Sequence, residues 1–324
     1  MANSAFVRSL QSIAEVKLDE PLSRHTTIGI GGPADAFAAA TSVEQLAALL
    51  DVSRRFDMPF FVLGSGSNIV VGDRGIRGLT IENKATHYTQ PRAVEIQAAA
   101  APVSEGSGVP SYRVRAETGA SFALTSRQLA FAGFQGLEWA CGIPGTIGGA
   151  VVYNAGAYGG CLGDVLERIA VWDAVDGVRQ YEAADLGLVY RGSAFTKGLM
   201  AGRAVLWAEF VLWPGDQAEL RARIADYDTR RLKAQPRGRN AGSFFKNPPG
   251  SPAWKLLDGV GLRGYQIGGA RFSDKHCNFL INGGDATAAD VAALKALAQQ
   301  RVREQYGVEL EGEVSFVGEG FGEA

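Results

Sequence analysis

Apolar residues recur along the chain with two spacings, one typical of helices and the other of strands. The helical spacing predicts helices over residues 4–16, 43–56, 125–134, 216–233, 254–260 and 288–305. Ser42 and Thr287 stand where N-caps are expected, and Gly307 stands where the last helix should end. Alternation and short apolar runs predict strands at 59–63, 69–71, 278–282 and 308–317, and several more within 76–124 and 165–212. This mixture predicts an α+β protein.

Pro and Gly residues between these elements suggest where the chain divides into domains. Pro214-Gly215 precedes the predicted helix at 216–233, and we place a domain boundary there, giving domains 1–213 and 214–324. The polar stretch 102–111, which contains Gly and Pro, is predicted to be a surface loop. In the strand predicted at 308–317, strict alternation puts Glu309, Glu311 and Glu313 on one face, for which a solvated edge is the ordinary explanation.

Composition excludes several classes of protein. Gly makes up 42 of the 324 residues, nearly double the usual share, and the net charge is −2, which argues against a general nucleic-acid binder. No apolar run is long enough to span a membrane, and Arg8, Gln11 and Glu15 interrupt any signal-peptide core. Three scattered cysteines suit neither a disulfide framework nor a zinc site. We therefore expect a cytoplasmic globular protein without a metal centre.

The most unusual stretch is 142–163, GIPGTIGGAVVYNAGAYGGCLG, in which 8 of 22 residues are Gly. Because Gly loses more backbone entropy on folding than any other residue, such a run does not gain stability from its composition. It is typical of backbone that comes close to a ligand, although a series of tight turns between short strands remains the alternative. We favour a ligand, because a second Gly-rich loop lies upstream.

That second loop, Gly64-Ser-Gly-Ser-Asn68, lies between two predicted strands. It is not a dinucleotide fingerprint, because position 69 is Ile where a third Gly is needed and a strand follows instead of a helix. The chain also contains no G-x-x-x-x-G-K-[ST] motif. The amides of the loop can still form a concavity for a diphosphate, although a plain hairpin is the alternative.

Two further stretches carry candidate chemistry. A basic run extends from Arg221 to Arg239, and it is either a solvated helix face or a site for the phosphates of an anionic substrate. Asn240 to Pro248 (NAGSFFKNP) then brings a hydroxyl, a cation and an amide together. His25 lies in the loop 24–33, where it is either a flavin tether or, more commonly for such a residue, a hydrogen-bonded surface histidine.

Six motifs in order resemble the UDP-N-acetylenolpyruvoylglucosamine reductase (MurB) family, over about residues 24–318. They are GSGSNIVV (64–71), GLEWACGIPGTIGGAVVYNAGAYG (136–159), YRGSAF (190–195), AGSFFKNP (241–248), GGARFSDKHCNFLIN (268–282) and LEGEV (310–314). Tyr153 replaces a more usual Met, and 102–111 resembles an insertion. The short connection from Arg191 to Ser243 is similar to that of the shorter class of the family, which lacks a flap that brings a Tyr over the substrate.

The resemblance implies a PCMH-type FAD-binding domain of two α/β subdomains, followed by a C-terminal α+β substrate-binding domain. It implies FAD held without a covalent bond, reduction of the flavin by NADPH, and conversion of a UDP-sugar enolpyruvyl ether to UDP-N-acetylmuramate in peptidoglycan synthesis. The expected catalytic residues are Arg191, Ser243 and Glu313. The expected cofactor contacts are Gly64, Ser65, Gly66, Ser67, Asn68, Gly142, Ile143, Gly145, Thr146, Gly148 and Gly149. The expected substrate contacts are Lys246, Asn247, Asn154, Tyr158, Arg230 and Arg231.

These residue types suit the reaction. Hydride arriving at the vinyl carbon pushes charge onto the neighbouring carbon and its carboxylate, which Arg191 can hold with a two-pronged grip. Ser243 can supply the proton. Glu313 helps only if it is protonated or tightly hydrogen-bonded, since a free carboxylate would repel the enolate. The structural alternatives are a domain-bridging ion pair for Arg191, a turn hydroxyl for Ser243 and a solvated edge charge for Glu313.

Two other classes of function stay open at this stage. One is another flavin enzyme of the same cofactor fold, such as an alcohol or hydroxyacid oxidase, which often tethers its flavin through His or Cys. Acid precipitation separates such an oxidase from the reductase, because a covalently bound flavin stays in the pellet and a non-covalent one enters the supernatant. The other is a non-catalytic nucleotide-sugar binding protein, which would bind UDP sugars without oxidising NADPH.

Overall fold

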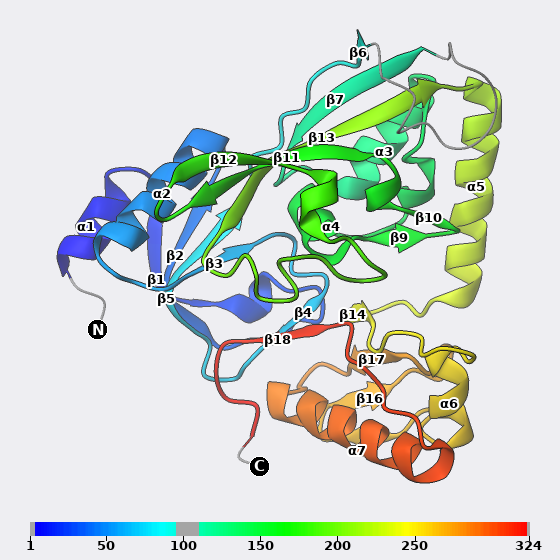
Figure 1. The fold of residues 1–324 in the computed structure, drawn as a ribbon. Coiled ribbons are helices and arrows are strands. Elements are labelled where there is room, and N and C mark those ends of the chain that lie inside the picture. The colour runs from blue at the N-terminus through cyan, green and yellow to red at the C-terminus, as the bar shows by residue number, and fades with distance from the viewer. Residues whose placement is uncertain (1–3, 95–109, 323–324) are drawn as a thin grey trace. The chain divides into compact units, whose positions relative to one another are not determined.

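The computed structural model describes residues 4–94 and 110–322 (Figure 1). The chain forms two compact units that interleave along the sequence. Unit 1 contains Met1–Ala38, Arg55–Glu82 and Leu232–Ala324, and unit 2 contains Ala39–Arg54 and Asn83–Arg231. The chain therefore crosses between the units four times, and the last crossing lies within a helix, between Arg231 and Leu232. The boundary predicted between 213 and 214 stays a prediction about functional domains.

The N-terminal part of unit 1 is a sheet whose strands are ordered β1-β2-β5-β3. Helix α1 (Ser4–Gln11) precedes β1 (Val16–Pro21) and the short helix η1 (Leu22–Arg24), and β2 (Pro33–Ala40) pairs antiparallel with β1. Strand β3 (Phe60–Leu63) pairs parallel with β5 (Ile76–Asn83), and β4 (Ile69–Val71) lies between them in sequence. The loop 64–68 is thus the connection from β3 to β4.

The C-terminal part of unit 1 is a second sheet, β14-β17-β16-β15, with two helices on one face (Figure 1). Its strands are β14 (Asn240–Ser243), β15 (Gln266–Ile267), β16 (Ala270–Phe272) and β17 (Phe279–Asn282). Buried residues of α6 (Ala253–Gly259) and α7 (Ala288–Tyr306) share one core with this sheet. The last strand, β18 (Ser315–Val317), returns to pair parallel with β4, so the chain end completes the neighbourhood of loop 64–68.

Unit 2 is built on a six-stranded sheet. Five of its strands follow the order β12-β11-β13-β7-β6, and the sixth, β8, pairs with β13. The strands are β6 (Arg92–Val94), β7 (Ser111–Glu117), β8 (Phe134–Gln135), β11 (Leu166–Asp173), β12 (Gly177–Glu182) and β13 (Ala204–Pro214). A hairpin of β9 (Gly156–Ala157) and β10 (Gly160–Cys161) lies apart from it. Helices α2 (Val43–Arg55), α3 (Phe122–Phe131), α4 (Ile147–Tyr153) and α5 (Gln217–Ala234) complete the unit, with short helices η2 (Glu138–Ala140), η3 (Leu162–Asp164) and η4 (Ala183–Leu186).

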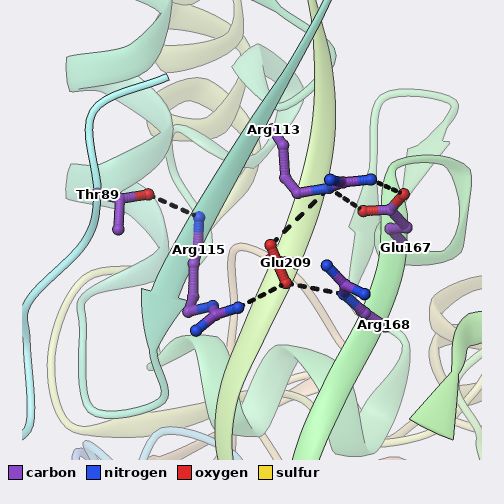
Figure 2. A network of polar contacts seen from close by, with 6 residues as sticks. All are labelled: Thr89, Arg113, Arg115, Glu167, Arg168 and Glu209. Carbon is purple, nitrogen blue, oxygen red and sulfur yellow. Dashed lines mark hydrogen bonds and ion pairs between the residues drawn. The ribbon is translucent and has the colours of Figure 1, made fainter. Parts of the chain in front are cut away.

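One face of this sheet carries a network of ion pairs centred on Glu209 of β13 (Figure 2). Its carboxylate accepts hydrogen bonds from Arg168 at 2.8 Å and Arg115 at 3.1 Å, which are its cross-strand neighbours. Burial raises the pKa of Glu209, but the bonds from these two arginines outweigh burial and leave the pKa below its usual value. Arg113 pairs with Glu167 through two bonds of 2.5 Å. Charged side chains thus tie β7, β13 and β11 together.

Most helices predicted from the sequence are confirmed to within three residues at either end. Ser42 Oγ accepts from Gln45 N at 3.2 Å, and Thr287 caps α7 with an Oγ1 acceptor 3.1 Å from Asp290 N. Gly307 ends α7 in the left-handed conformation, with φ +67°. Helix α5 buries Leu220 and Ile224, as its periodicity predicted. The α+β class is confirmed.

Two predicted element bounds are wrong, and a third prediction falls mainly outside the described residues. The helix predicted over 4–16 ends at Gln11, because the chain turns there to enter β1. Only Ser315–Val317 of the strand predicted over 308–317 pairs with another strand, although burial still alternates from 308 to 311. Residues 308–314 lie along α7. Their backbone bonds are to residues 244–246, which follow the end of β14 and form only one bridge, from Phe245 to Gly312. The surface loop predicted at 102–111 falls mainly outside the described residues.

Candidate functional site

In unit 1 the loop 64–68 is fixed by the segment that precedes β2. Gly66 has φ +61°, and a Cβ on it would lie 2.2 Å from the carbonyl oxygen of His25. Thr27 donates to the Gly66 carbonyl from its amide at 3.0 Å and from its hydroxyl at 3.3 Å. Gly66 is therefore needed because the protein's own backbone lies too close for a Cβ atom. We had predicted close approach of a ligand for this loop instead.

Other groups of the same loop remain available to a ligand. Within the described residues, the backbone N–H groups of Ser65 and Gly66 have no hydrogen-bond acceptor, and Ser65 is exposed. Such amides in a bend can bind the oxygens of a phosphate, so the loop fits the diphosphate of a dinucleotide. Asn68 is used differently, because its side-chain amide donates to the carbonyl of Glu313 at 3.2 Å and its own carbonyl accepts from Ser315 N at 3.0 Å.

The structure brings Ser243 and Glu313, both of unit 1, close together. Ser243 ends β14, where the register with β17 shifts, and Gly242 before it has φ +82°. Glu313 N donates to the carbonyl of Phe244, the residue after Ser243, at 2.9 Å. Ser243 and Glu313 are each half-buried. A β-bulge of this kind re-aims a side chain away from the regular pleat, so the local backbone sets the direction of the Ser243 hydroxyl.

Lys246 and Asn247, two expected substrate contacts of unit 1, already have protein partners. The Lys246 ammonium donates to Glu311, and Lys246 N donates to the Glu311 carbonyl at 2.9 Å. The side-chain oxygen of Asn247 accepts from Ala253 N, at the start of α6, at 3.0 Å. Both side chains therefore need to share or exchange partners to contact a substrate, and that role stays a prediction.

The Gly-rich stretch of unit 2 contains a helix, α4, that the sequence analysis did not predict. Thr146 is its N-cap, with Oγ1 3.4 Å from Gly149 N, and the helix buries Ile147, Ala150 and Val151. Its two glycines differ. A Cβ on Gly148 would lie 3.0 Å from Thr118, whereas a Cβ on Gly149 would meet only Thr146 Oγ1, at 3.9 Å. Space beside Gly149 is what close approach of a cofactor to backbone requires.

The other expected cofactor contacts of this stretch are held by unit 2 itself. Gly145 has φ +136°, and its carbonyl accepts from Phe122 N at 3.0 Å. Ile143 is half-buried, with its amide 2.9 Å from the Ala140 carbonyl. A Cβ on Gly142 would lie 2.9 Å from the Arg231 side chain. These contacts form a rigid wall, and binding of FAD to it stays a prediction.

Three expected site residues of unit 2 share an unusual backbone conformation. Among the described residues other than Gly, positive φ occurs at Asn154 (+43°), Tyr158 (+53°) and Arg191 (+53°), and otherwise only at two aspartates, Asp19 and Asp57. Arg191 donates to the Gly156 carbonyl at 2.8 Å, which places its guanidinium against the β9–β10 hairpin, the hairpin that also carries Tyr158. Strained conformations of this kind persist where the surrounding structure fixes them and are concentrated at functional sites.

The basic run divides once its contacts are seen. Arg221 stacks on Phe131, Arg223 pairs with Glu138, and Arg230 pairs with Asp226 on the exposed face of α5. Arg231 differs, because it is half-buried beside Gly142 and the described residues offer its guanidinium no carboxylate within ion-pair distance. Burial lowers the pKa of Arg231. Asp228 is paired with Arg127 and raises the pKa of Arg231 only from beyond ion-pair distance, so this half-buried cation still favours an anionic ligand.

Tyr158 lies in the same neighbourhood as Arg231. Its ring stacks on Tyr227 of α5, with centroids 4.2 Å apart, and its hydroxyl donates to the Tyr227 carbonyl at 2.9 Å. Burial raises the pKa of Tyr158, so the phenol stays protonated at neutral pH. The contact between Tyr158 and Tyr227 was not predicted, since helical spacing alone carries no signal for it.

His25 is half-buried in unit 1, so the expectation of a surface histidine is wrong in that detail. Its Nε2 lies 3.0 Å from a carboxylate oxygen of Glu20, and its Nδ1 lies 3.8 Å from Glu82. The ring also packs on Phe37, at 4.3 Å between centroids. Both ring nitrogens and one ring face therefore contact protein groups, as expected for a hydrogen-bonded histidine.

The described residues contain neither a membrane-spanning helix nor a metal-binding cluster. No helix in 4–94 or 110–322 is long and apolar enough to cross a membrane. Over the same ranges, no cluster of three or more His, Cys, Asp or Glu side chains is placed to hold a metal ion.

Two known protein families match this chain. The family described as "FAD binding domain" matches residues 34–179, and the family described as "UDP-N-acetylenolpyruvoylglucosamine reductase, C-terminal domain" matches residues 234–317. The first match contains the loop 64–68 and the Gly-rich stretch, and the second contains Ser243 and Glu313. The predicted combination of an FAD-binding domain with a C-terminal α+β domain is thereby confirmed.

Individual relatives match over almost the whole chain. UDP-N-acetylenolpyruvoylglucosamine reductases of Agathobacter rectalis and Desulfosudis oleivorans are 40% and 43% identical, covering 98% and 94% of this chain and 99% and 95% of theirs. The crystal structure of the reductase (MurB) from Thermus caldophilus superposes with a TM-score of 0.71 at 32% identity, over 94% of this chain and 98% of that one. The chain therefore belongs to the UDP-N-acetylenolpyruvoylglucosamine reductase family of flavin-dependent oxidoreductases.

Proposed function

We propose that the protein uses NADPH and non-covalently bound FAD to reduce UDP-N-acetylglucosamine enolpyruvate to UDP-N-acetylmuramate, a step of peptidoglycan precursor synthesis in the cytoplasm. The observation that carries the proposal is the match of almost the whole chain to reductases of this family, together with Ser243 and Glu313 on adjacent backbone. FAD, when bound, supplies the hydride that NADPH provides and that the enolpyruvyl double bond accepts.

The remaining chemistry falls to side chains of the protein. Arg191 binds the substrate carboxylate, because a guanidinium presents two parallel donors to the oxygens on which charge develops. A donor that is fixed before the reaction starts stabilises that charge without reorganisation. Arg191 is fixed by its backbone conformation and by its hydrogen bond to the Gly156 carbonyl. Arg231 is placed to bind an anionic part of the substrate, such as a phosphate.

Proton delivery is assigned to Ser243. Addition of hydride to the vinyl carbon leaves the neighbouring carbon carbanion-like and basic enough to take a proton from a hydroxyl. Glu313 is bonded through its backbone to the residue after Ser243. A free carboxylate there would repel the developing charge, so we assign its carboxyl group a role only in protonated or hydrogen-bonded form. The roles of all three residues are parts of this proposal.

The test follows both half-reactions by stopped-flow absorbance in Ser243→Ala. NADPH should bleach the flavin at close to the normal rate, and the enolpyruvyl substrate should then reoxidise it at least about 10³-fold more slowly, as expected for loss of general acid catalysis. Ser12→Ala removes an exposed hydroxyl of unit 1 and serves as the control. Reoxidation of Ser243→Ala at more than about a tenth of the normal rate would exclude Ser243 as the proton donor.

The chemical identity of the reaction needs a separate measurement. Purified protein should be yellow, and acid precipitation should leave the colour in the supernatant, as expected for FAD that is not covalently bound. NADPH oxidation should depend on the enolpyruvyl UDP sugar. A protein that binds the UDP sugar but never consumes NADPH would overturn the proposed activity.

A further inference from the structure

The turn that carries Arg191 is held in a conformation that its own residues do not favour. Val189 and Gly192 exchange both backbone hydrogen bonds, at 3.0 and 3.1 Å, which leaves Tyr190 and Arg191 at the tip. Arg191 there has φ +53°. A left-handed conformation costs a residue with a Cβ about 1–2 kcal/mol, so contacts outside the turn must hold it.

Those contacts come from the end of helix α4. Asn154 is the left-handed residue that ends the helix, and its side-chain nitrogen donates to the Val189 carbonyl at 2.9 Å. On the other side of the turn, the hydroxyl of the fully buried Ser193 donates to the Val152 carbonyl at 2.6 Å. Both sides of the turn are therefore held by the same three-residue stretch, 152–154, at the end of α4.

The Asn154 side chain is oriented from both of its ends. While its nitrogen donates to Val189, its oxygen accepts from Gly163 N at 2.9 Å, and the residue is 5% exposed. Asn is also one of the few residues that enter the left-handed region at low cost. Asn154 thus combines a tolerated backbone, an acceptor for Gly163 and a donor for Val189, and its amide already has partners inside unit 2.

We propose that Asn154 is a positioning residue that acts through Val189 to hold Arg191, instead of contacting the substrate itself. This inference rests on the proposed function, in which Arg191 binds the substrate carboxylate. The guanidinium is the end of a long side chain, and its aim depends on the backbone at its base. Losing the bond to Val189 releases that backbone and loosens the aim without removing the charge.

The substitution Asn154→Asp separates the two bonds of the side chain. Asp keeps an oxygen for Gly163 and tolerates the left-handed backbone, but it presents an acceptor to the Val189 carbonyl where Asn presents a donor. Asn154→Gly keeps the backbone freedom and loses both bonds, so it serves if Asn154→Asp does not fold. Ser193→Ala removes the second fastening and leaves Asn154 in place.

A double-mutant cycle with Arg191→Lys tests the inference, with flavin reoxidation by substrate as the measured rate. We expect Asn154→Asp to slow reoxidation by roughly 10-fold or more and Arg191→Lys by about 10²-fold, with the double variant no slower than Arg191→Lys alone, because coupled residues are not additive. Reduction by NADPH should not change. Losses that multiply in the double variant would show that Asn154 acts independently of Arg191, and this overturns the inference.

Hydrogen exchange gives a readout that does not depend on activity. In Asn154→Asp and in Ser193→Ala, peptides that contain the Gly192 amide should exchange faster, while the sheet strands β11 and β13 keep their protection. Normal exchange at Gly192 together with normal reoxidation in Asn154→Asp would also overturn the inference. A normal rate in Arg191→Lys would instead refute the role of Arg191 in the proposed function, so the two failures are distinguishable.

Discussion

Glycine recurs in two stretches of this protein, residues 64–75 in unit 1 and residues 142–163 in unit 2, and the surroundings of these glycines differ. In the first, added Cβ atoms would meet backbone of unit 1: Gly66 would clash with His25, Gly72 with Glu319 and Gly75 with Pro33, at 1.8–2.2 Å. In the second, Gly156 and Gly160 would also meet protein atoms, at 2.7 and 2.6 Å, whereas Gly149 and Gly159 have no neighbour closer than 3.9 Å. A high Gly content therefore indicates close approach, but only the structure tells whether the neighbour is the protein or a ligand.

The largest expected effect tests the first half of this comparison. Gly66→Ala should lower the free energy of unfolding of the flavin-free protein by at least about 3 kcal/mol, since overpacking and positive-φ strain each cost about 1–3 kcal/mol. Gly177→Ala is the matched control, because Gly177 has φ +73° but nothing within 4 Å of its Cβ position. Denaturant unfolding measures both, and equal losses would show that the His25 backbone yields.

A second prediction concerns the ion pairs that unit 2 uses where the loop of unit 1 uses backbone contacts. Glu209→Gln should cost about 1–3 kcal/mol at pH 7, the usual loss when a buried charged group is left without its hydrogen-bond partner. The folded-state pKa of Glu209 lies below its unfolded value, so its contribution is present above that unfolded value and is lost as pH falls through the folded one.

Urea unfolding at neutral and acid pH checks this sign. The difference between the natural protein and Glu209→Gln should shrink as the pH is lowered from 7 towards the folded-state pKa of Glu209. A difference that stays constant over that range would mean that the network contributes through packing and not through the charge of the carboxylate.

The smallest effect sharpens the second half of the comparison. Gly149→Ala should raise the stability of the flavin-free protein by about 0.5–1 kcal/mol, because Ala replaces Gly inside a helix with room for its methyl group. It should also weaken FAD binding, if FAD occupies that room. Gly148→Ala, in the same helix but against Thr118, should not stabilise the protein. Thermal melting with and without FAD separates the two effects.

The sequence predicted those elements whose information is local. Helices α5 and α7 show apolar residues at helical spacing, and Thr287 and Gly307 mark the ends of α7, so their bounds were predicted to within a residue or two. Helix α4 was missed because two Gly and two Val give it poor helix propensity. It forms because Ile147, Ala150 and Val151 pack into the core of unit 2, and no local pattern records that packing.

The candidate site was predictable as a set of residues but not as an arrangement. Motifs named Arg191, Ser243 and Glu313 as candidates, whose roles stay predictions. In the structure, Glu313 N donates to the carbonyl of Phe244, the residue after Ser243. Nothing in the sequence indicated that Arg191 is left-handed, since arginine has no preference for that region. The strand expected from 308 also failed for a physical reason, because alternation records which side chains are buried but not whether a neighbouring strand exists.

The interleaved order of the units has a consequence for synthesis on the ribosome. Unit 2 is complete once Arg231 has emerged, and domains fold as units during translation. The loop 64–68 has by then long been made, but the carbonyl of Asn68 must wait for Ser315 and its side chain for Glu313. We therefore expect nascent chains arrested after residue 231 to protect unit 2 from protease while loop 64–68 is still cleaved, so that the first-made part of the site is the last to mature.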